Sequence, residues 1–133
     1  MRPVARPLAL VTAAALSLIP VGAIAGDVEK GARAFRKCAA CHVAEENGPK
    51  KPGPNLWGVV GRGIGTLEGF DFSTAMVDAG KAGRVWSEEE LDVFVTEPRS
   101  ALKGSKMTFA GIKKADERAD LIAYLKTRGP ASN

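Results

Sequence analysis

Two thiols and an imidazole lie close together in the pentad Cys38-Ala39-Ala40-Cys41-His42. At this spacing the two sulfurs can form thioethers with the vinyl groups of a haem while the adjacent imidazole binds the iron, which is the attachment pattern of a c-type haem. The chain of 133 residues has no other cysteine and no other histidine. A structural disulfide would therefore have to join Cys38 and Cys41 themselves. No second imidazole is present to bind the other side of the iron.

Other uses of this pentad are less well supported. A redox disulfide of the CxxC type normally follows a buried strand in a βαβ unit, whereas residues 28–37 have a helical pattern. A structural zinc site needs four ligands that are mostly Cys or His, and this chain supplies three. A thiol oxidoreductase therefore ranks last among the possible functions.

The N-terminus has the pattern of an export signal. Arg2 and Arg6 precede an uncharged apolar stretch over residues 8–25, which ends in Ala23-Ile24-Ala25. This is the composition of a secretory signal with an A-x-A cleavage site. We predict a signal peptide at 1–25 and one domain at 26–133, so that removing 25 of the 133 residues leaves 108, and we expect a bacterial periplasm. The alternative is an uncleaved anchor facing the periplasm, because 18 apolar residues approach spanning length.

The charge of the chain indicates protein partners rather than nucleic acid. The formal net charge is +4, and loss of Arg2 and Arg6 leaves +2, which is too small for a typical nucleic-acid-binding domain. A basic surface near the haem would steer acidic docking patches of redox partners. The lysines predicted to form that surface are Lys37, Lys50, Lys51, Lys103, Lys106, Lys113 and Lys114.

The sequence predicts short helices joined by glycine-rich loops. Helices are expected over 28–37, with Asp27 as N-cap, over 71–80, from a capping box of Ser87 and Glu90 to a stop at Pro98, and over 116–128. Residues 47–68 are too rich in glycine and proline for regular structure, and no strand pattern or repeat is present. So long a loop in a small domain indicates a large bound group that holds it in place.

Two methionines of the predicted mature chain could bind the iron opposite His42. Met76 lies inside a predicted helix, where filling the core is the usual role of a thioether. Met107 lies in the loop 103–111, which can bend toward the iron, and we favour it as the ligand. His/Met ligation raises the reduction potential and leaves no open coordination site. It therefore predicts outer-sphere electron transfer.

Segments spread over residues 26–128 resemble class I cytochromes c, close to the mitochondrial type and to bacterial cytochromes c2. The resemblance implies an all-α fold of about four to five short helices wrapped around one covalent haem c. It also implies a soluble, monomeric carrier of single electrons rather than an enzyme. The matching segments are Gly26-Asp27-Val28-Glu29-Lys30-Gly31, the pentad, Gly53-Pro54-Asn55-Leu56 with Gly61-Arg62, Trp86, Lys106-Met107 with Phe109-Ala110-Gly111-Ile112-Lys113-Lys114, and Asp120-Leu121-Ile122-Ala123-Tyr124-Leu125.

The resemblance implies a role for each residue at the iron. Cys38 and Cys41 would carry the haem, and His42 and Met107 would be the axial ligands. The carbonyl of Pro54 would accept the other imidazole N–H of His42, which fixes the ring and strengthens its donation to the iron.

Residues farther from the iron also receive roles from the resemblance. Arg62 and the indole N–H of Trp86 would meet a haem propionate, and Ser105 stands where the family usually has a threonine near a propionate. Phe109 would cover the exposed haem edge. Gly31 would permit close packing where the first and last helices cross.

Three positions depart from the mitochondrial pattern. Phe72 and Phe94 stand where the family commonly has tyrosines, and Met76 stands where a buried asparagine is usual. A drier pocket should raise the reduction potential, whereas an unpaired propionate should lower it. The direction of the net effect stays open at the level of sequence.

Two further functions are compatible with the sequence. One is a haem subunit that stays docked to a dehydrogenase or oxidase, and the other is a peroxidase-like haem protein whose Met107 ligand dissociates. The electron donor and acceptor could serve respiration, photosynthesis or oxidation of a small substrate, because fold and site do not choose among partners.

Overall fold

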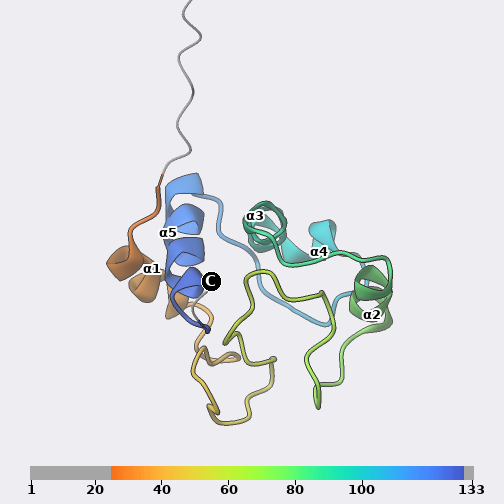
Figure 1. The fold of residues 1–133 in the computed structure, drawn as a ribbon. Coiled ribbons are helices and arrows are strands. Elements are labelled where there is room, and N and C mark those ends of the chain that lie inside the picture. Colours follow the sequence, from red (N-terminus) through yellow and green to blue (C-terminus); the bar gives the residue numbers. More distant parts are fainter. Residues whose placement is uncertain (1–24, 131–133) are drawn as a thin grey trace, which may run out of the picture.

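The computed structural model describes residues 25–130, so the predicted signal peptide at 1–25 lies almost wholly outside the described residues. Within this range the chain forms five helices, which are α1 (Val28–Phe35), α2 (Thr74–Lys81), α3 (Glu88–Thr96), α4 (Pro98–Ala101) and α5 (Ala115–Lys126) (Figure 1). Extended pairing over residues 25–130 is limited to one isolated bridge between Gly63 and Val85. The predicted all-α class is confirmed. None of the helices in the described range has the length and hydropathy needed to cross a bilayer.

The first and last helices cross at Gly31, as predicted. The carboxylate of Asp27 caps α1 by accepting the N–H of Lys30 at 2.9 Å. A Cβ atom at Gly31 would lie 2.0 Å from the carbonyl oxygen of Asp120 in α5, so only glycine allows this approach. Next to the crossing, the ring of Phe35 lies 5.4 Å from that of Tyr124. The close contact fixes the segment that follows α1, which is the pentad.

The structure corrects two predicted helix boundaries near the middle of the chain. Helix α2 begins at Thr74 rather than at residue 71, because the hydroxyl of Ser73 accepts the N–H of Met76 at 3.3 Å and acts as N-cap. Pro98 was predicted only to end a helix. It also begins α4, since proline fits the first helical position, where its missing N–H is not needed.

The ends of α3 and α5 also differ in detail from the sequence-based expectation. The hydroxyl of Ser87 accepts the N–H of Glu90 at 3.1 Å, but the carboxylate of Glu90 pairs with Arg84 instead of completing the capping box. Helix α5 starts at Ala115 and ends at Lys126, which is two residues before the predicted end.

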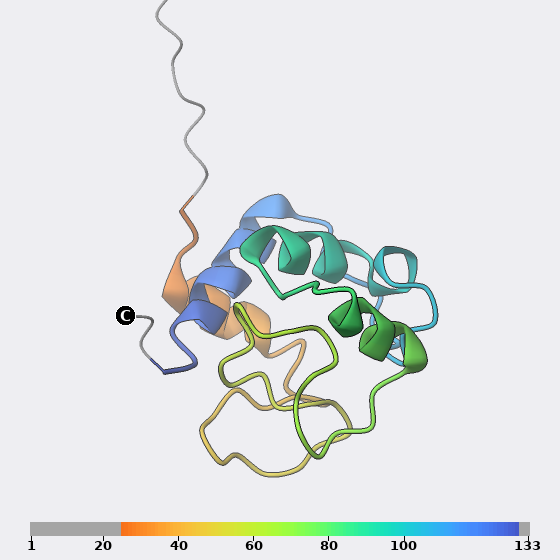
Figure 2. The same cartoon turned by 45° about the vertical axis from the view of Figure 1, so that its right-hand side comes forward.

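The chain between α1 and α2 has no helix and is held by backbone hydrogen bonds. The N–H of Leu56 donates to the carbonyl of Val43 at 2.7 Å, and the N–H of Ile64 donates to that of Arg84 at 3.0 Å. Ile64 has no exposed surface. In Figure 2 this segment, coloured yellow to green, lies on one side of the molecule while α3 and α5 lie on the other. The predicted long loop therefore forms a wall facing the helices.

Candidate functional site

A cavity of about 480 Å³ lies between the long loop and the helices. Its walls come from the loop between α1 and α2, from α2, α3 and α5, and from the segment between α4 and α5. The structure brings all nine sequence-predicted site residues to this one cavity. They are Cys38, Cys41, His42, Pro54, Arg62, Trp86, Ser105, Met107 and Phe109.

The two thiols lie on one tight turn at the cavity wall. The N–H groups of Cys41 and His42 donate to the carbonyl of Cys38 at 3.0 and 2.9 Å, and the ammonium of Lys51 donates to the carbonyl of Ala39. The two cysteines are not joined in a disulfide, and burial raises the pKa of the Cys38 thiol to about 11. A thiol with that pKa is neutral at pH 7, whereas a redox-active cysteine needs a lowered pKa. The turn suits attachment of a group better than thiol exchange.

His42 is held in one orientation by the loop. Its side chain is 9% exposed, and its Nδ1 lies 2.8 Å from the carbonyl oxygen of Pro54. Burial lowers the pKa of the imidazole, so the ring is neutral at pH 7. Since a carbonyl can only accept, Nδ1 carries the proton and Nε2 keeps its lone pair. His42 is therefore prepared to bind a metal through Nε2.

Gly53 brings the Pro54 carbonyl close to the imidazole. A Cβ atom at Gly53 would lie 2.5 Å from Cε1 of His42, and the N–H of Gly53 donates to the carbonyl of Cys41 at 2.7 Å. The sequence places Gly53 in a matching motif but gives no sign of this contact. The absence of a side chain at Gly53 allows the loop and the ring to approach.

A partly buried positive charge lies at another part of the wall. The guanidinium of Arg62 donates to the carbonyls of Trp57 at 3.1 Å and Asn55 at 3.0 Å. Burial lowers the pKa of Arg62, yet an arginine stays protonated in proteins. Trp86, which is 7% exposed, joins Arg62 through a backbone bond from its N–H to the Arg62 carbonyl at 2.8 Å. The pair can offer N–H donors to an anionic group, and the two supporting carbonyls were not predicted.

The segment between α4 and α5 supplies a soft ligand to the same cavity. Met107 and Phe109 are half-buried and pack against the core, and the hydroxyl of Ser105 accepts the N–H of Met107 at 3.3 Å. Met76 also lines the cavity and is 9% exposed, so the cavity contains two thioethers.

Phe72 and Phe94, which depart from the mitochondrial pattern, are cavity residues too. The ring of Phe94 lies 4.9 Å from that of Trp86. The phenyl rings make this part of the wall apolar where a tyrosine would have offered a hydroxyl.

These residues fit a haem and do not fit a bare metal ion. Within the described residues no group of three or more His, Cys, Asp or Glu side chains could bind such an ion. The cavity has mostly apolar walls, two thiols, an imidazole with a free Nε2 and an arginine for a carboxylate. Its volume lies in the range of cofactor pockets, roughly 300–1,000 Å³. An apolar macrocycle with acidic substituents and its own metal ion matches this set.

Comparison with known proteins decides the family. The family model described as "Cytochrome c" matches residues 28–129. The chain belongs to the cytochrome c family. It is 50% identical over 103 residues to "Cytochrome c" of Chlamydomonas reinhardtii, covering 77% of this chain and 89% of that one. It is 45% identical over 100 residues to "Cytochrome c2" of Agrobacterium tumefaciens, covering 75% and 90%.

Solved structures agree with this assignment. The fold matches cytochrome c2 from Rhodospirillum centenum with a TM-score of 0.74 and 36% identity, covering 79% of this chain and 100% of that chain. It matches cytochrome cH from Methylobacterium extorquens with a TM-score of 0.68 and 41% identity, covering 77% and 99%. The chain is a cytochrome c with one covalently attached haem c, and it is an electron carrier rather than an enzyme.

Proposed function

We propose that His42 and Met107 are the axial ligands of the iron and that Cys38 and Cys41 carry the haem as thioethers. The observation that carries this proposal is the hydrogen bond from Nδ1 of His42 to the Pro54 carbonyl, which leaves Nε2 as the only free nitrogen of the ring. Met107 and both thiols line the same cavity as this imidazole. When bound, the haem supplies a one-electron Fe(III)/Fe(II) couple. The Pro54 carbonyl orients the imidazole and increases its basicity.

Two axial protein ligands favour electron transfer without binding of a substrate. A neutral thioether stabilises ferrous iron and raises the reduction potential. With both axial positions filled by the protein, a small molecule has no open site on the metal. Phe109, from the segment between α4 and α5, lines the cavity and would cover the exposed edge of a bound haem, through which electrons would pass.

Arg62, Trp86 and Ser105 are proposed to hold the haem propionates. Supporting this role, Arg62 is a partly buried cation whose two donors to backbone carbonyls fix its plane at the cavity wall. A charged group buried without a partner is costly, and a propionate would supply the opposite charge.

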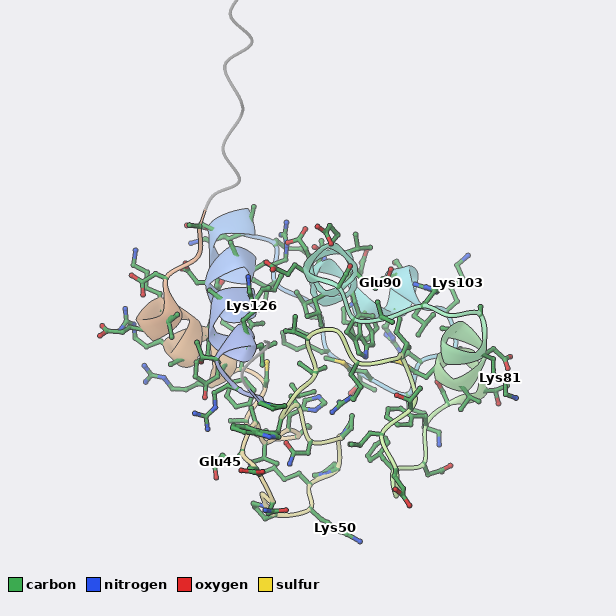
Figure 3. The ribbon with its side chains drawn as sticks, viewed as in Figure 1. Glu45, Lys50, Lys81, Glu90, Lys103 and Lys126 are labelled. Carbon is green, nitrogen blue, oxygen red and sulfur yellow. The ribbon has the colours of Figure 1, made fainter. Side chains whose placement is uncertain are left out.

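The proposed redox partners carry acidic docking patches. The seven predicted lysines are all exposed, and two of them, Lys37 and Lys106, also line the cavity. Figure 3 shows Lys50 and Lys103 projecting outward from the lower loop and from near α4. Three of the seven lysines pair with acids of the same chain, as in the bridge of Lys106 with Asp71 at 2.9 Å. We therefore expect Lys50, Lys51, Lys103 and Lys114 to contribute most to steering.

The same proposal includes a monomeric shuttle in a bacterial periplasm. The export pattern at 1–25 and the similarity to bacterial proteins named cytochrome c2 support this location. Association with an acidic partner should slow as the ionic strength rises, because salt screens steering between exposed charges. A rate of electron transfer that is independent of salt would contradict the proposed role of the lysines.

The two methionines allow a matched test of ligation. In Met107→Ala, the weak far-red band of sulfur bound to ferric iron should disappear, and the untreated protein should bind cyanide or carbon monoxide rapidly. In Met76→Ala, which removes the other thioether of the cavity, the band should persist. A band that survives in Met107→Ala and disappears in Met76→Ala would assign the ligand to Met76 and contradict the proposal.

A further inference from the structure

Arg128, just after the end of α5, joins that helix to the loop between α1 and α2 through three contacts, and a fourth contact is with Tyr124 of α5 itself. Its Nε donates to the carbonyl of Ala44 at 2.8 Å. Its guanidinium carbon lies 5.5 Å from the ring centroid of Trp57 and 5.7 Å from that of Tyr124, within the range of cation–π interactions. Its carbonyl accepts the N–H of Gly58 at 2.7 Å. Arg128 thus contacts the loop at Ala44 and again 13 and 14 residues later, at Trp57 and Gly58.

Trp57 links this contact to the cavity. Its ring lies against Arg128 while its carbonyl accepts a hydrogen bond from Arg62 at 3.1 Å. The second carbonyl that holds Arg62 belongs to Asn55, whose amide donates to the carbonyl of Glu45 at 2.9 Å and whose side-chain oxygen accepts the N–H of Trp57 at 2.9 Å. The Asn55 carbonyl is therefore held in place by the hydrogen bonds of the Asn55 side chain. The Trp57 carbonyl is held in place by the contact of the Trp57 ring with Arg128.

We propose that Arg128 is a positioning residue of the haem site, which acts through Trp57 on Arg62. The inference rests on the proposed role of Arg62 toward a propionate. Arginine suits this place because its planar group can lie against two aromatic rings while one N–H donates to a carbonyl, whereas lysine has neither the plane nor the fork of donors. Without this support, Trp57 and its carbonyl are less fixed, and the cation at the cavity wall becomes less well held.

The expected consequence is a lower reduction potential. A cation fixed near the haem offsets propionate charge and so favours the ferrous state over the ferric state, which carries one more positive charge. When Arg62 moves toward water, that stabilisation of the ferrous state decreases. A contact that only stabilised the fold would change the unfolding midpoint and leave the potential unchanged.

The test uses Arg128→Lys in the haem-loaded protein, because lysine keeps the charge and removes the planar contacts. The potential measured by voltammetry should fall, in the same direction as in Arg62→Gln and by a smaller amount. The double variant should have the potential of Arg62→Gln alone, since the two residues act in series. Arg99→Lys, the same exchange at an exposed position of α4, should leave the potential unchanged.

The results distinguish a failure of the positioning role of Arg128 from a failure of the proposed role of Arg62. If Arg62→Gln lowers the potential and Arg128→Lys does not, or if the two shifts add fully, Arg128 is not a positioning residue and the role of Arg62 stands. If Arg62→Gln leaves the potential unchanged, the proposed role of Arg62 fails and the inference with it. Should Arg128→Lys fail to take up haem, Trp57→Leu removes the same aromatic contact and must give the lowered potential.

Discussion

Replacement of Gly53 by alanine should both destabilise the protein and alter the iron site. The added Cβ would lie 2.5 Å from Cε1 of His42 and 2.8 Å from the carbonyl oxygen of Cys41. Carbon atoms in ordinary contact are about 3.5 Å apart, so the ring or the loop must move by roughly 1 Å. The imidazole is 9% exposed and bonded to the Pro54 carbonyl, so it has little room to yield. The methyl group therefore loosens the hydrogen bond at Nδ1.

The size of the loss follows from two opposing effects. Overpacking a well-packed site costs about 1–3 kcal/mol. Alanine also reduces the conformational entropy of the unfolded chain, which raises the free energy of unfolding by about 0.4–1 kcal/mol. This gain is available because Gly53 does not have the positive φ that would strain an alanine. We expect the free energy of unfolding to fall by about 1–2 kcal/mol. The reduction potential should rise, because a weaker bond to Pro54 makes the imidazole a poorer donor to ferric iron.

Guanidinium unfolding and voltammetry on the haem-loaded variant measure the two effects. Gly69→Ala is the matched control: Gly69 has a φ of +78° and nothing within 4 Å of its ideal Cβ. Its variant should lose about 1–2 kcal/mol through backbone strain alone, with no change in potential. If Gly53→Ala has the stability and the potential of the unmodified protein, close packing of Gly53 on His42 does not position the ligand and the reasoning is wrong.

Three further substitutions test the fold around the site. Gly31→Ala should reduce the free energy of unfolding by about 1–3 kcal/mol, because its Cβ would lie 2.0 Å from the Asp120 carbonyl oxygen. An increase of about 1 kcal/mol, as alanine gives in an exposed helix, would refute the close crossing of α1 and α5. Ser87→Ala should cost about 1 kcal/mol by removing the acceptor for the N–H of Glu90, and unchanged unfolding would show that the cap is unimportant. The hydrogen bond from the N–H of Lys30 holds the pKa of Asp27 below its ordinary value of 3.8, so its charge stabilises the fold above that pH and ceases to do so as the pH falls through the lowered pKa. The stability of Asp27→Asn should therefore approach that of the unmodified protein in acid, and a difference that widens there would contradict this sign.

Local signals in the sequence predicted most helices but not all of their ends. The caps of α1 and α3 are Asp27 and Ser87, polar residues followed by an acidic first turn, and both were predicted. The cap of α2 was missed because Asp71 and Ser73 are both good caps, and the choice between them depends on the burial of Ser73. The bridge of Gly63 with Val85 joins residues that are far apart in sequence, so no local pattern predicts it.

The site could be predicted as far as its side chains carry recognisable chemistry. Thiols, imidazole, thioether and guanidinium have characteristic uses, and the residues bearing them line one cavity. The carbonyls that hold Arg62 could not be predicted, because every residue has a carbonyl and its direction depends on the folded loop. Arg128 contacts Ala44 across 84 residues of sequence, and its role appears only when α5 and the loop are packed together.

Mass spectrometry of the exported native protein tests the central claim, which is that both thiols of the pentad carry one haem. The intact chain should have the added mass of a single haem, and the peptide with Cys38 and Cys41 should retain that mass and resist alkylation. A native protein without the added mass, in which both thiols react with an alkylating reagent, would contradict the account.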